Sequence, residues 1–298
     1  MRHAILGAGG VGGLIGGCLA RFGDKVTLVV RPGTAESYPR EIRVESRLGS
    51  FNAEVSIAGE VPPVEILWIT VKATQLEGAL KSVTNPDAIG RMVPLLNGID
   101  HVALLRSKYG QEQVIPGTFA GESERVSRGH FVHRSPFANL NILSAGRDEL
   151  GATLEKFQNF GFECRFVDNE ATLLWGKLVF LAPFALSTTA ADKNVGDVLA
   201  DPHWGALGKT CVGETCAVGM AEGAEVSAEK VLAGVARMPA GMRSSMQKDV
   251  ESGNPPELDA IAGPVLRGAK KHGIEVPATR ELVAGVERRV GATASLIA

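Results

Sequence analysis

Apolar and polar positions in the first part of the chain form two kinds of segment. Short runs rich in Val, Ile and Leu have the length of buried strands, and the stretches between them carry apolar residues at helical spacing. Strands that alternate with helices are typical of a parallel sheet covered on both faces, so we expect a doubly wound α/β domain. The expected strands are residues 3–6, 25–30, 66–71 and 92–96, and the expected helices are residues 14–22 and 74–83.

Further short elements extend this region. Two short segments in which apolar and polar residues alternate flank the turn sequence Leu48-Gly49-Ser50 and predict a hairpin. The last strand expected before Asp168, residues 163–167, is expected to close the sheet. The hairpin strands are residues 42–44 and 51–55, later strands are expected at 114–115, 131–133 and 140–143, and a helix at 150–160.

The pattern changes after Asp168, where alternation almost disappears and long helical patterns replace it. Residues 171–186 are apolar around most of the helix circumference, which predicts a buried central helix. A chain of 298 residues also exceeds what one core usually needs. We therefore expect two domains, residues 1–168 and an all-helical domain of residues 169–298. Amphipathic helices of the second domain are expected at 207–223, 228–236, 258–272 and 280–290.

Composition narrows the class of partner. The formal net charge is -2 and the pI is near 6.3, so there is no global positive field of the kind that attracts nucleic acid or an anionic membrane. A small-molecule partner is expected instead. We find no charged and apolar leader and no uncharged apolar run of membrane-spanning length, which predicts a cytoplasmic protein. No metal is expected, because Cys18, Cys164, Cys211 and Cys216, and the pair His130 and His133, lack the spacing of a complete ligand set.

The first strand runs directly into the glycine-rich sequence GAGGVGG. Gly7 permits a tight turn, Gly9 removes a side chain that would block a pyrophosphate, and Gly12 lets the next helix pack close to the strand. The N–H groups at the start of that helix are free to bind phosphate. This strand–turn–helix context predicts a dinucleotide site that also includes Gly10 and Val11.

The end of the second strand indicates which dinucleotide binds. An NAD site usually has Asp or Glu at this position, whereas this chain has Arg31, which favours a 2′-phosphate. The alternative is a solvated turn residue in the sequence Arg-Pro-Gly. We expect NADP, as NADPH, to be the preferred cofactor.

Other polar side chains follow expected strands or lie in the helical part. Lys72 and Gln75 follow the strand at 66–71, and Asn97 follows the next strand, where ligands of open α/β sheets bind. The alternative is an ordinary strand-end lysine and an Asn-Gly turn. Lys177 lies on the apolar helix, an expensive place for an ammonium group unless it faces a cleft or a partner, and Glu257 begins a later helix.

Short motifs in the same order along nearly the whole chain carry a resemblance. They are GAGGVGG at 7–13, VKATQ at 71–75, NG at 97–98, WGKL at 175–178, RSSMQKD at 243–249, ELD at 257–259 and HGIEVPATR at 272–280. Each motif is short, but together they are specific. The chain resembles the ketopantoate reductase (2-dehydropantoate 2-reductase) family.

The resemblance implies a Rossmann domain followed by a helical domain of the 6-phosphogluconate dehydrogenase C-terminal type, with the substrate between them. It further implies NADPH-dependent reduction of 2-dehydropantoate to pantoate, a step of pantothenate biosynthesis. Lys177 matches the catalytic lysine that donates a proton to the keto oxygen or polarises it, and Glu257 matches the acidic residue beside it. Ser245 matches a substrate contact, and Asn97 and Lys72 match cofactor-side positions, Asn97 being also a candidate substrate contact.

The chain departs from the family pattern after the lysine. Leu181 and Ala185 occupy positions where asparagines are expected to bind the polar groups of the 2-oxo acid. A third asparagine position falls on Val195 or, with a one-residue shift, on Asn194, which we take as a candidate substrate contact. Loss of buried amide donors changes specificity strongly, so the chain is a candidate paralogue with an altered substrate.

Three alternatives follow. The first is a reductase of the same architecture that acts on another 2-oxo acid, a larger ketone or an imine. The second is a sensor that binds NADPH without turnover, against which Lys177 and Glu257 argue. The third, a purely structural or protein-interaction module, leaves the glycine motif and Arg31 unexplained. The helix at 258–272 is equally able to cover the core or to pair with a second copy in a homodimer.

Overall fold

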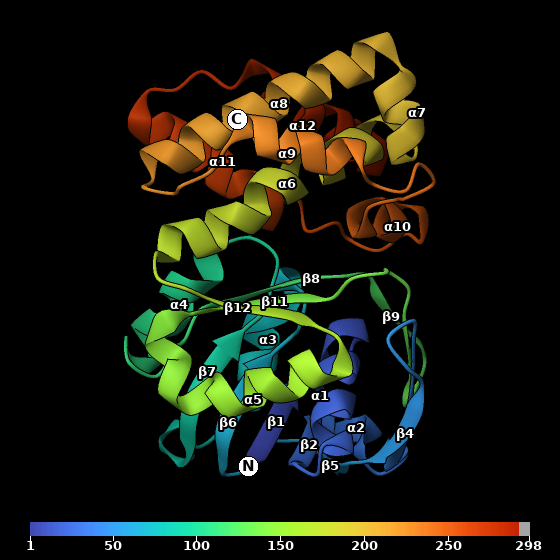
Figure 1. The fold of residues 1–298 in the computed structure, drawn as a ribbon, viewed down its shortest axis with the longest axis vertical. Helices are drawn as coiled ribbons and strands as arrows, with labels where there is room; N and C mark the ends of the chain where they lie inside the picture. The colour runs from blue at the N-terminus through green and yellow to red at the C-terminus, as the bar shows by residue number, and fades with distance from the viewer. Residues whose placement is uncertain (292–298) are drawn as a thin grey trace. The chain divides into compact units, whose positions relative to one another are not determined.

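The computed structural model describes residues 1–291 and divides them into two compact units (Figure 1). The sheet unit comprises Met1–Leu96 and His101–Asp168. The helical unit begins at Asn169 and also includes the short segment Asn97–Asp100. The chain therefore leaves the sheet unit for four residues before it returns.

A five-stranded parallel sheet forms the centre of the sheet unit. Its strands are β1 (Arg2–Leu6), β2 (Lys25–Val29), β5 (Ser56–Ala58), β6 (Val64–Ile69) and β7 (Ile89–Pro94). They lie in the order β5-β2-β1-β6-β7, and each neighbouring pair is parallel. Counted along the chain within this sheet, the order is 3-2-1-4-5, which is that of a dinucleotide-binding fold.

Alternate residues of β1 enter different cores. Ile5 packs in a cluster with residues of α1 (Gly10–Arg21) and α5 (Arg147–Phe160). Ala4 and Leu6 pack in another cluster with residues of α3 (Leu76–Leu80) and α4 (Asp100–Tyr109). Successive strand residues point to opposite faces, so both faces of the sheet are covered and the doubly wound prediction is confirmed.

The crossover helix expected at 74–83 is shorter than predicted. A 3₁₀ turn, Ala73–Gln75, precedes the five-residue helix α3. Short helical segments also occur at α2 (Pro32–Ala35), Pro86–Ala88 and Ser144–Gly146.

A second sheet of four strands lies against α1. The predicted hairpin is present as β3 (Glu41–Ser46) and β4 (Phe51–Glu54). β3 also pairs in parallel with β10 (His130–His133), which pairs with β9 (Ser123–Ser127). β9 was not predicted, because four of its five residues are exposed and it has no apolar periodicity.

Two strand predictions are corrected by the observed pairing. β12 (Glu163–Val167) does not close the parallel sheet but lies at the edge of a three-stranded sheet, in the order β12-β11-β8. Its partners are β11 (Asn139–Leu143) and, next to that, β8 (Gly117–Ala120). The strand expected at 114–115 is only an isolated bridge between Val114 and Met92. Apolar spacing predicts that a strand is buried, but not which neighbour it pairs with.

Helices alone make up the unit from Asn169 onward, as far as the structure describes it. Its longest helix, α6 (Glu170–Ala191), is capped by the Asn169 side chain, which accepts a hydrogen bond from the Thr172 N–H at 2.9 Å. α7 (Val195–Ala200) and α10 (Ser245–Glu251) were not predicted because they are only six and seven residues long. The remaining helices are α8 (Pro202–Ala221), α9 (Ala228–Ala236), α11 (Leu258–His272) and α12 (Pro277–Val290).

α6 forms the centre of the helical unit's core. Leu178, Ala182 and Leu186 of this helix pack in one cluster with buried residues of α8, α11 and α12. By length and composition α6 would also pass for a membrane span, but 61% of its apolar window is buried inside the protein. It is therefore interpreted as a core helix, as its sequence predicts.

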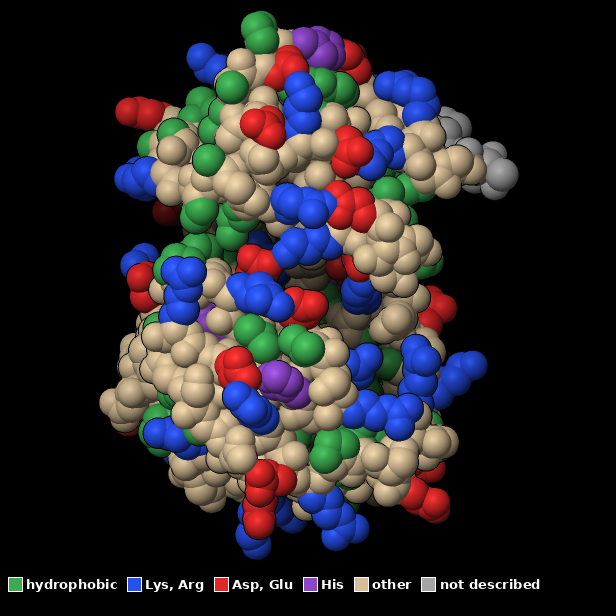
Figure 2. Space-filling model, turned by 90° about the vertical axis from the view of Figure 1, so that its right-hand side faces the viewer, with side chains coloured by type: hydrophobic (Ala, Val, Ile, Leu, Met, Phe, Trp, Pro, Cys, Tyr) green, Lys and Arg blue, Asp and Glu red, His purple; other side chains and the backbone are tan. Residues whose placement is uncertain are grey.

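Charged side chains of both signs are spread over the face of the molecule drawn in Figure 2. This distribution agrees with the formal net charge of -2.

Candidate active site

The glycine-rich loop joins β1 to α1. Gly7 has a φ of +107°, a conformation that side chains disfavour, and its carbonyl accepts hydrogen bonds from the Gly9 N–H at 2.8 Å and the Thr70 hydroxyl at 2.8 Å. No side chain caps the start of α1, and its first turn contains no acidic residue. The helix therefore presents its N-terminal N–H groups and the positive end of its dipole to a ligand.

The space around each glycine fits the role that the sequence assigns to it. A Cβ at Gly12 would lie 2.2 Å from the Gly7 carbonyl oxygen and 2.4 Å from the Thr70 hydroxyl, so α1 packs too closely on the loop for any side chain. A Cβ at Gly9 would meet nothing within 4 Å, so the space over the loop is open. A bound pyrophosphate needs a helix packed closely on the loop and open space on the side of the loop where the phosphates lie. The residues fit a dinucleotide.

β9 contributes two contacts to this loop that sequence reasoning missed. The Ser123 hydroxyl donates to the Gly10 carbonyl at 2.9 Å, and Arg125 Nη1 donates to the Ala8 carbonyl at 3.2 Å. The backbone of β9 lies so close that a Cβ at Gly10 would be 1.9 Å from the Ser123 carbonyl oxygen. Arg125 is thus an exposed cation beside the glycine loop. No sequence signal predicts it, because it lies more than a hundred residues away in an unpredicted strand.

The other predicted cofactor residues follow strands of the same sheet. Arg31 is exposed, two residues after β2, and its carbonyl accepts a hydrogen bond from the Thr34 N–H at 2.8 Å. Lys72 is partly buried and directly precedes the 3₁₀ turn after β6, and Gln75 is the exposed last residue of that turn. Val11 packs against the core cluster beneath α1. Parallel strands end at one edge of a sheet, so the loops after β1, β2 and β6 share that edge.

Lys177, Asn97 and Glu257 are brought together within the helical unit. The Lys177 ammonium donates a hydrogen bond to Asn97 Oδ1 at 2.9 Å. Asn97 Nδ2 donates to Glu257 Oε2, also at 2.9 Å. Glu257 is only 6% exposed, and it immediately precedes the first turn of α11. The Asn97 amide thus bridges the ammonium group of Lys177 in α6 and the carboxylate that precedes α11.

Opposing effects determine the charge on Lys177. Burial of the ammonium group lowers its pKa to about 8, and the Glu257 carboxylate acts in the opposite direction. A lysine with this pKa holds a proton at neutral pH and releases it more readily than an exposed lysine. The group is suited to donate a proton to a developing oxyanion.

The other predicted substrate residues have different surroundings. Ser245 is the exposed first residue of α10, whereas Ser244 is buried and bonded to Thr188. The Asn194 amide caps α7, accepting from the Asp197 N–H at 2.9 Å and donating to the Asp197 carboxylate at 2.7 Å. These two bonds make Asn194 the N-terminal cap of α7.

The positions after Lys177 in α6 are apolar, as the sequence requires. Leu181 lies one helical turn beyond Lys177, is partly buried and packs against the core cluster, and Ala185 is fully buried. Phe180 and Phe184 pack together on the same helix with ring centroids 6.3 Å apart. This part of α6 offers no side-chain amide to a ligand.

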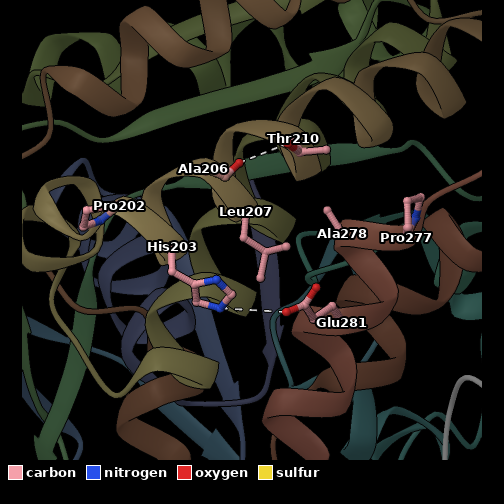
Figure 3. Close-up of a pocket in the computed structure, with 8 residues that line it drawn as sticks. All are labelled: Pro202, His203, Ala206, Leu207, Thr210, Pro277, Ala278 and Glu281. Carbon is pink, nitrogen blue, oxygen red and sulfur yellow. Dashed lines mark hydrogen bonds and ion pairs between the residues drawn. The ribbon is translucent and has the colours of Figure 1, made fainter.

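A groove between α8 and α12 is separate from these residues (Figure 3). It has a volume of about 530 Å³. His203 and Glu281 face each other across it at 3.8 Å and are both exposed. None of the predicted site residues lines it. His203 and Trp204 lie in the first turn of α8, where the Asp201 side chain caps their N–H groups.

Comparison with known proteins agrees with this geometry. The family model described as ketopantoate reductase PanE/ApbA matches residues 3–143, and the model of the family's C-terminal domain matches residues 170–289. Together the two matches span most of both structural units. The chain belongs to the ketopantoate reductase PanE/ApbA family. It is an oxidoreductase of that family, whose members use NAD(P)H, and the resemblance inferred from the motifs is confirmed.

Individual relatives are similar over their full length. An uncharacterised oxidoreductase of Bacillus subtilis, YkpB, is 29% identical, with 96% of this chain and 98% of YkpB aligned. The 2-dehydropantoate 2-reductase of Archaeoglobus fulgidus is 28% identical over the same shares of each chain. The crystal structure of a family ketopantoate reductase from Ralstonia eutropha superimposes with a TM-score of 0.84 at 27% identity, covering 98% of this chain and 99% of the other. The predicted fold class is confirmed.

Proposed function

We propose that this protein is an NADPH-dependent reductase of a 2-oxo acid, with 2-dehydropantoate, reduced to pantoate, as the first candidate substrate. The observation that carries the proposal is the Lys177–Asn97–Glu257 cluster, because it holds a partly buried ammonium group in a defined position. If 2-dehydropantoate is the substrate, the protein takes part in pantothenate biosynthesis, and we propose a cytoplasmic location for it.

Lys177 supplies the proton and the positive charge that the reaction needs. When NADPH is bound, it supplies a hydride to the keto carbon of the substrate. The carbonyl π bond breaks as the new C–H bond forms, and negative charge develops on the oxygen. An ammonium group placed at that oxygen stabilises the charge and donates a proton, so that the product is a 2-hydroxy acid.

Asn97 and Glu257 support the lysine. Asn97 Oδ1 accepts a hydrogen bond from the ammonium group, which fixes the direction of one Nζ–H bond. Glu257 favours the charged form of Lys177 and is itself held by the Asn97 amide. Both residues orient and charge Lys177, and neither has to exchange a proton in the reduction.

The glycine loop and the strand ends would hold the cofactor. Gly7, Gly9, Gly10, Val11 and Gly12 provide the loop and the N–H groups for the pyrophosphate. For the 2′-phosphate we assign Arg31, and for other parts of the nucleotide Lys72 and Gln75. Arg125 adds a cation at the loop itself.

A second candidate is a reductase of a larger and more apolar 2-oxo acid, ketone or imine. The observation in its favour is that Leu181 packs in the core and Ala185 is fully buried, where asparagines would bind a polar substrate. Ser245 and Asn97 remain candidate substrate contacts in both cases. A sensor without turnover is disfavoured, because binding of the nucleotide alone does not need the ammonium group near Glu257.

The first experiment follows NADPH oxidation with 2-dehydropantoate and a panel of other 2-oxo acids, ketones and imines. Lys177→Ala is expected to lower kcat by about 10²-fold or more, because proton donation and charge stabilisation are lost together. The control is Lys209→Ala, which removes an exposed lysine from α8. Turnover of an apolar compound alone would select the second candidate, and wild-type turnover in Lys177→Ala would contradict both.

A further inference from the structure

The segment Asn97–Asp100 packs on the first turn of α11. Ile99 lies against the core cluster of the helical unit. Gly98 has a φ of +79°, and a Cβ there would lie 2.2 Å from the Ala260 carbonyl oxygen in α11. Only glycine combines this conformation with this close approach. The segment is therefore seated directly on the helix that Glu257 precedes.

One guanidinium group ties this segment to the same helix. Arg267 of α11 donates through Nη2 to the Asp100 carboxylate. Through Nη1 it donates to Asp259 Oδ1 at 2.7 Å. Asp100 ends the segment that begins with Asn97, and Asp259 lies two residues after Glu257. Arg267 thus connects the two backbone stretches that carry the partners of Lys177.

A glycine inside α11 makes this arrangement possible. Asp259, Gly263 and Arg267 lie four residues apart on one face of the helix. A Cβ at Gly263 would be 2.3 Å from Asp259 Oδ1 and 2.5 Å from Arg267 Nη2, so a side chain there would require the ends of these two flexible side chains to shift. Glycine weakens a helix relative to alanine. Here Gly263 leaves room for the Arg267 side chain to extend along the helix to Asp259.

We propose that Arg267, with Gly263 and Asp100, is a positioning residue that holds Asn97 in contact with Lys177. This inference rests on the proposed function, in which Lys177 is the proton donor. The hydrogen bonds of Arg267 go to Asp100 and Asp259, so it acts on Lys177 through the backbone of residues 97–100. All of these residues belong to the helical unit, so the Lys177 cluster is assembled within that unit.

Exposure limits the expected size of the effect. The Arg267, Asp100 and Asp259 side chains are each about half exposed or more, so each pair is screened by water. One planar guanidinium that joins two carboxylates constrains geometry better than two separate pairs. We therefore expect a change of about threefold to tenfold in kcat, rather than the loss expected for Lys177→Ala.

The test compares Gly263→Ala and Arg267→Ala with Gly213→Ala. Gly213 is also inside a helix, α8, but a Cβ there meets nothing within 4 Å. Three quantities are measured on the full-length protein: kcat and KM in the reduction, hydrogen exchange of residues 97–100, and the rate at which acetic anhydride labels Lys177, read by mass spectrometry. The last two need no turnover.

In Gly263→Ala and Arg267→Ala, the rate of hydrogen exchange of residues 97–100 and the rate of labelling of Lys177 should each rise at least about threefold. The reason is that the segment and the hydrogen bond between Lys177 and Asn97 are loosened. In both variants we expect kcat to fall while KM for NADPH stays constant. Arg267→Lys, which can still form one ion pair, should have a kcat between those of Arg267→Ala and the wild type. Gly213→Ala should change none of these quantities.

Two results would overturn the inference. One is unchanged labelling and exchange in folded Arg267→Ala and Gly263→Ala. The other is a loosened segment with wild-type kcat, which would make the contact structural only. Failure of the proposed function would be a separate result. It would appear as no reduction of any compound by the wild type, or as full turnover in Lys177→Ala. Labelling of Lys177 would still decide in that case whether Arg267 positions the lysine.

Discussion

At the scale of single residues, Lys177 is where burial and charge oppose each other. An ammonium group loses hydration when it is buried, and a nearby carboxylate recovers part of that loss. In this protein the balance leaves the pKa at about 8. The reaction would need the protonated form, so the pH dependence of turnover reports on this residue directly.

We expect kcat to be constant below pH 8 and to fall as the pH rises through the pKa of Lys177, by about tenfold per pH unit above it. The sign follows because the proton donor is lost on the alkaline side. Removing the Glu257 carboxylate in Glu257→Gln takes away the contribution that raises the pKa, so the fall should begin at lower pH. The measurement is the pH profile of kcat, and a profile without an alkaline limb would contradict the role of Lys177.

Substitution of Arg31 and of Arg125 should affect nucleotide binding differently. If Arg31 binds the 2′-phosphate, Arg31→Ala should raise the Kd of NADPH by about tenfold or more and leave that of NADH unchanged. Arg125 lies at the glycine loop, so Arg125→Ala should raise both Kd values by similar factors.

Both Kd values can be measured by titrating nicotinamide fluorescence. Arg128→Ala is the control, because Arg128 directly follows β9 and donates to Ser37 instead of the loop. Equal Kd values for NADPH and NADH in the wild type would argue against the assignment of Arg31.

At the scale of elements, the glycines of α1 serve packing in addition to the ligand binding proposed for them. Gly12 and Gly13 are both buried in this helix. A Cβ at Gly13 would lie 2.1 Å from the ring of Phe131 in β10, which is fully buried. The second sheet can lie against α1 only because the helix has no side chain there.

Gly13→Ala should therefore destabilise the protein by about 1–3 kcal/mol, since the buried ring has to move. Gly78→Ala in α3 is the matched control, where a Cβ meets nothing within 4 Å and alanine should stabilise the helix by up to about 1 kcal/mol. Urea unfolding of both variants measures the difference. A Gly13→Ala protein as stable as the control would show that the packing tolerates the methyl group.

At the scale of the whole molecule, the proposed cofactor residues and the Lys177 cluster belong to different compact units. The glycine loop, Arg31 and Lys72 are in the sheet unit, whereas Lys177, Asn97 and Glu257 are in the helical unit. Binding of the nucleotide and proton donation should therefore be separable by mutation.

NADPH at a hundredfold excess over its Kd should stabilise the wild type and Lys177→Ala equally, by about 2.7 kcal/mol each. The reason is that the variant keeps the whole glycine loop. Thermal unfolding with and without NADPH measures this, and hydrogen exchange should show the protection at residues 7–12. Loss of the stabilisation in Lys177→Ala would show that the lysine contributes to nucleotide binding.

Local pattern was sufficient for several features. The spacing of Gly7, Gly9 and Gly12 after an apolar strand predicted the loop, because these backbone constraints act within a few residues. The bounds of α9 and α11 agree with the residues predicted from amphipathic spacing, 228–236 and 258–272. A lysine on an apolar helix marked Lys177 as unusual, since the cost of burying it is a local property.

Other features depend on residues far apart in the sequence, and only the tertiary structure decided them. Strand pairing placed β12 in a separate sheet, because its partner is chosen by packing and not by its own alternation. The position of Arg125 at the glycine loop required the fold of β9. The attachment of Asn97 to the helical unit, and the space at Gly263 that lets Arg267 reach Asp100, exist only when distant segments meet. Periodicity along the chain determines which residues are buried, whereas contacts between segments determine which of them act together.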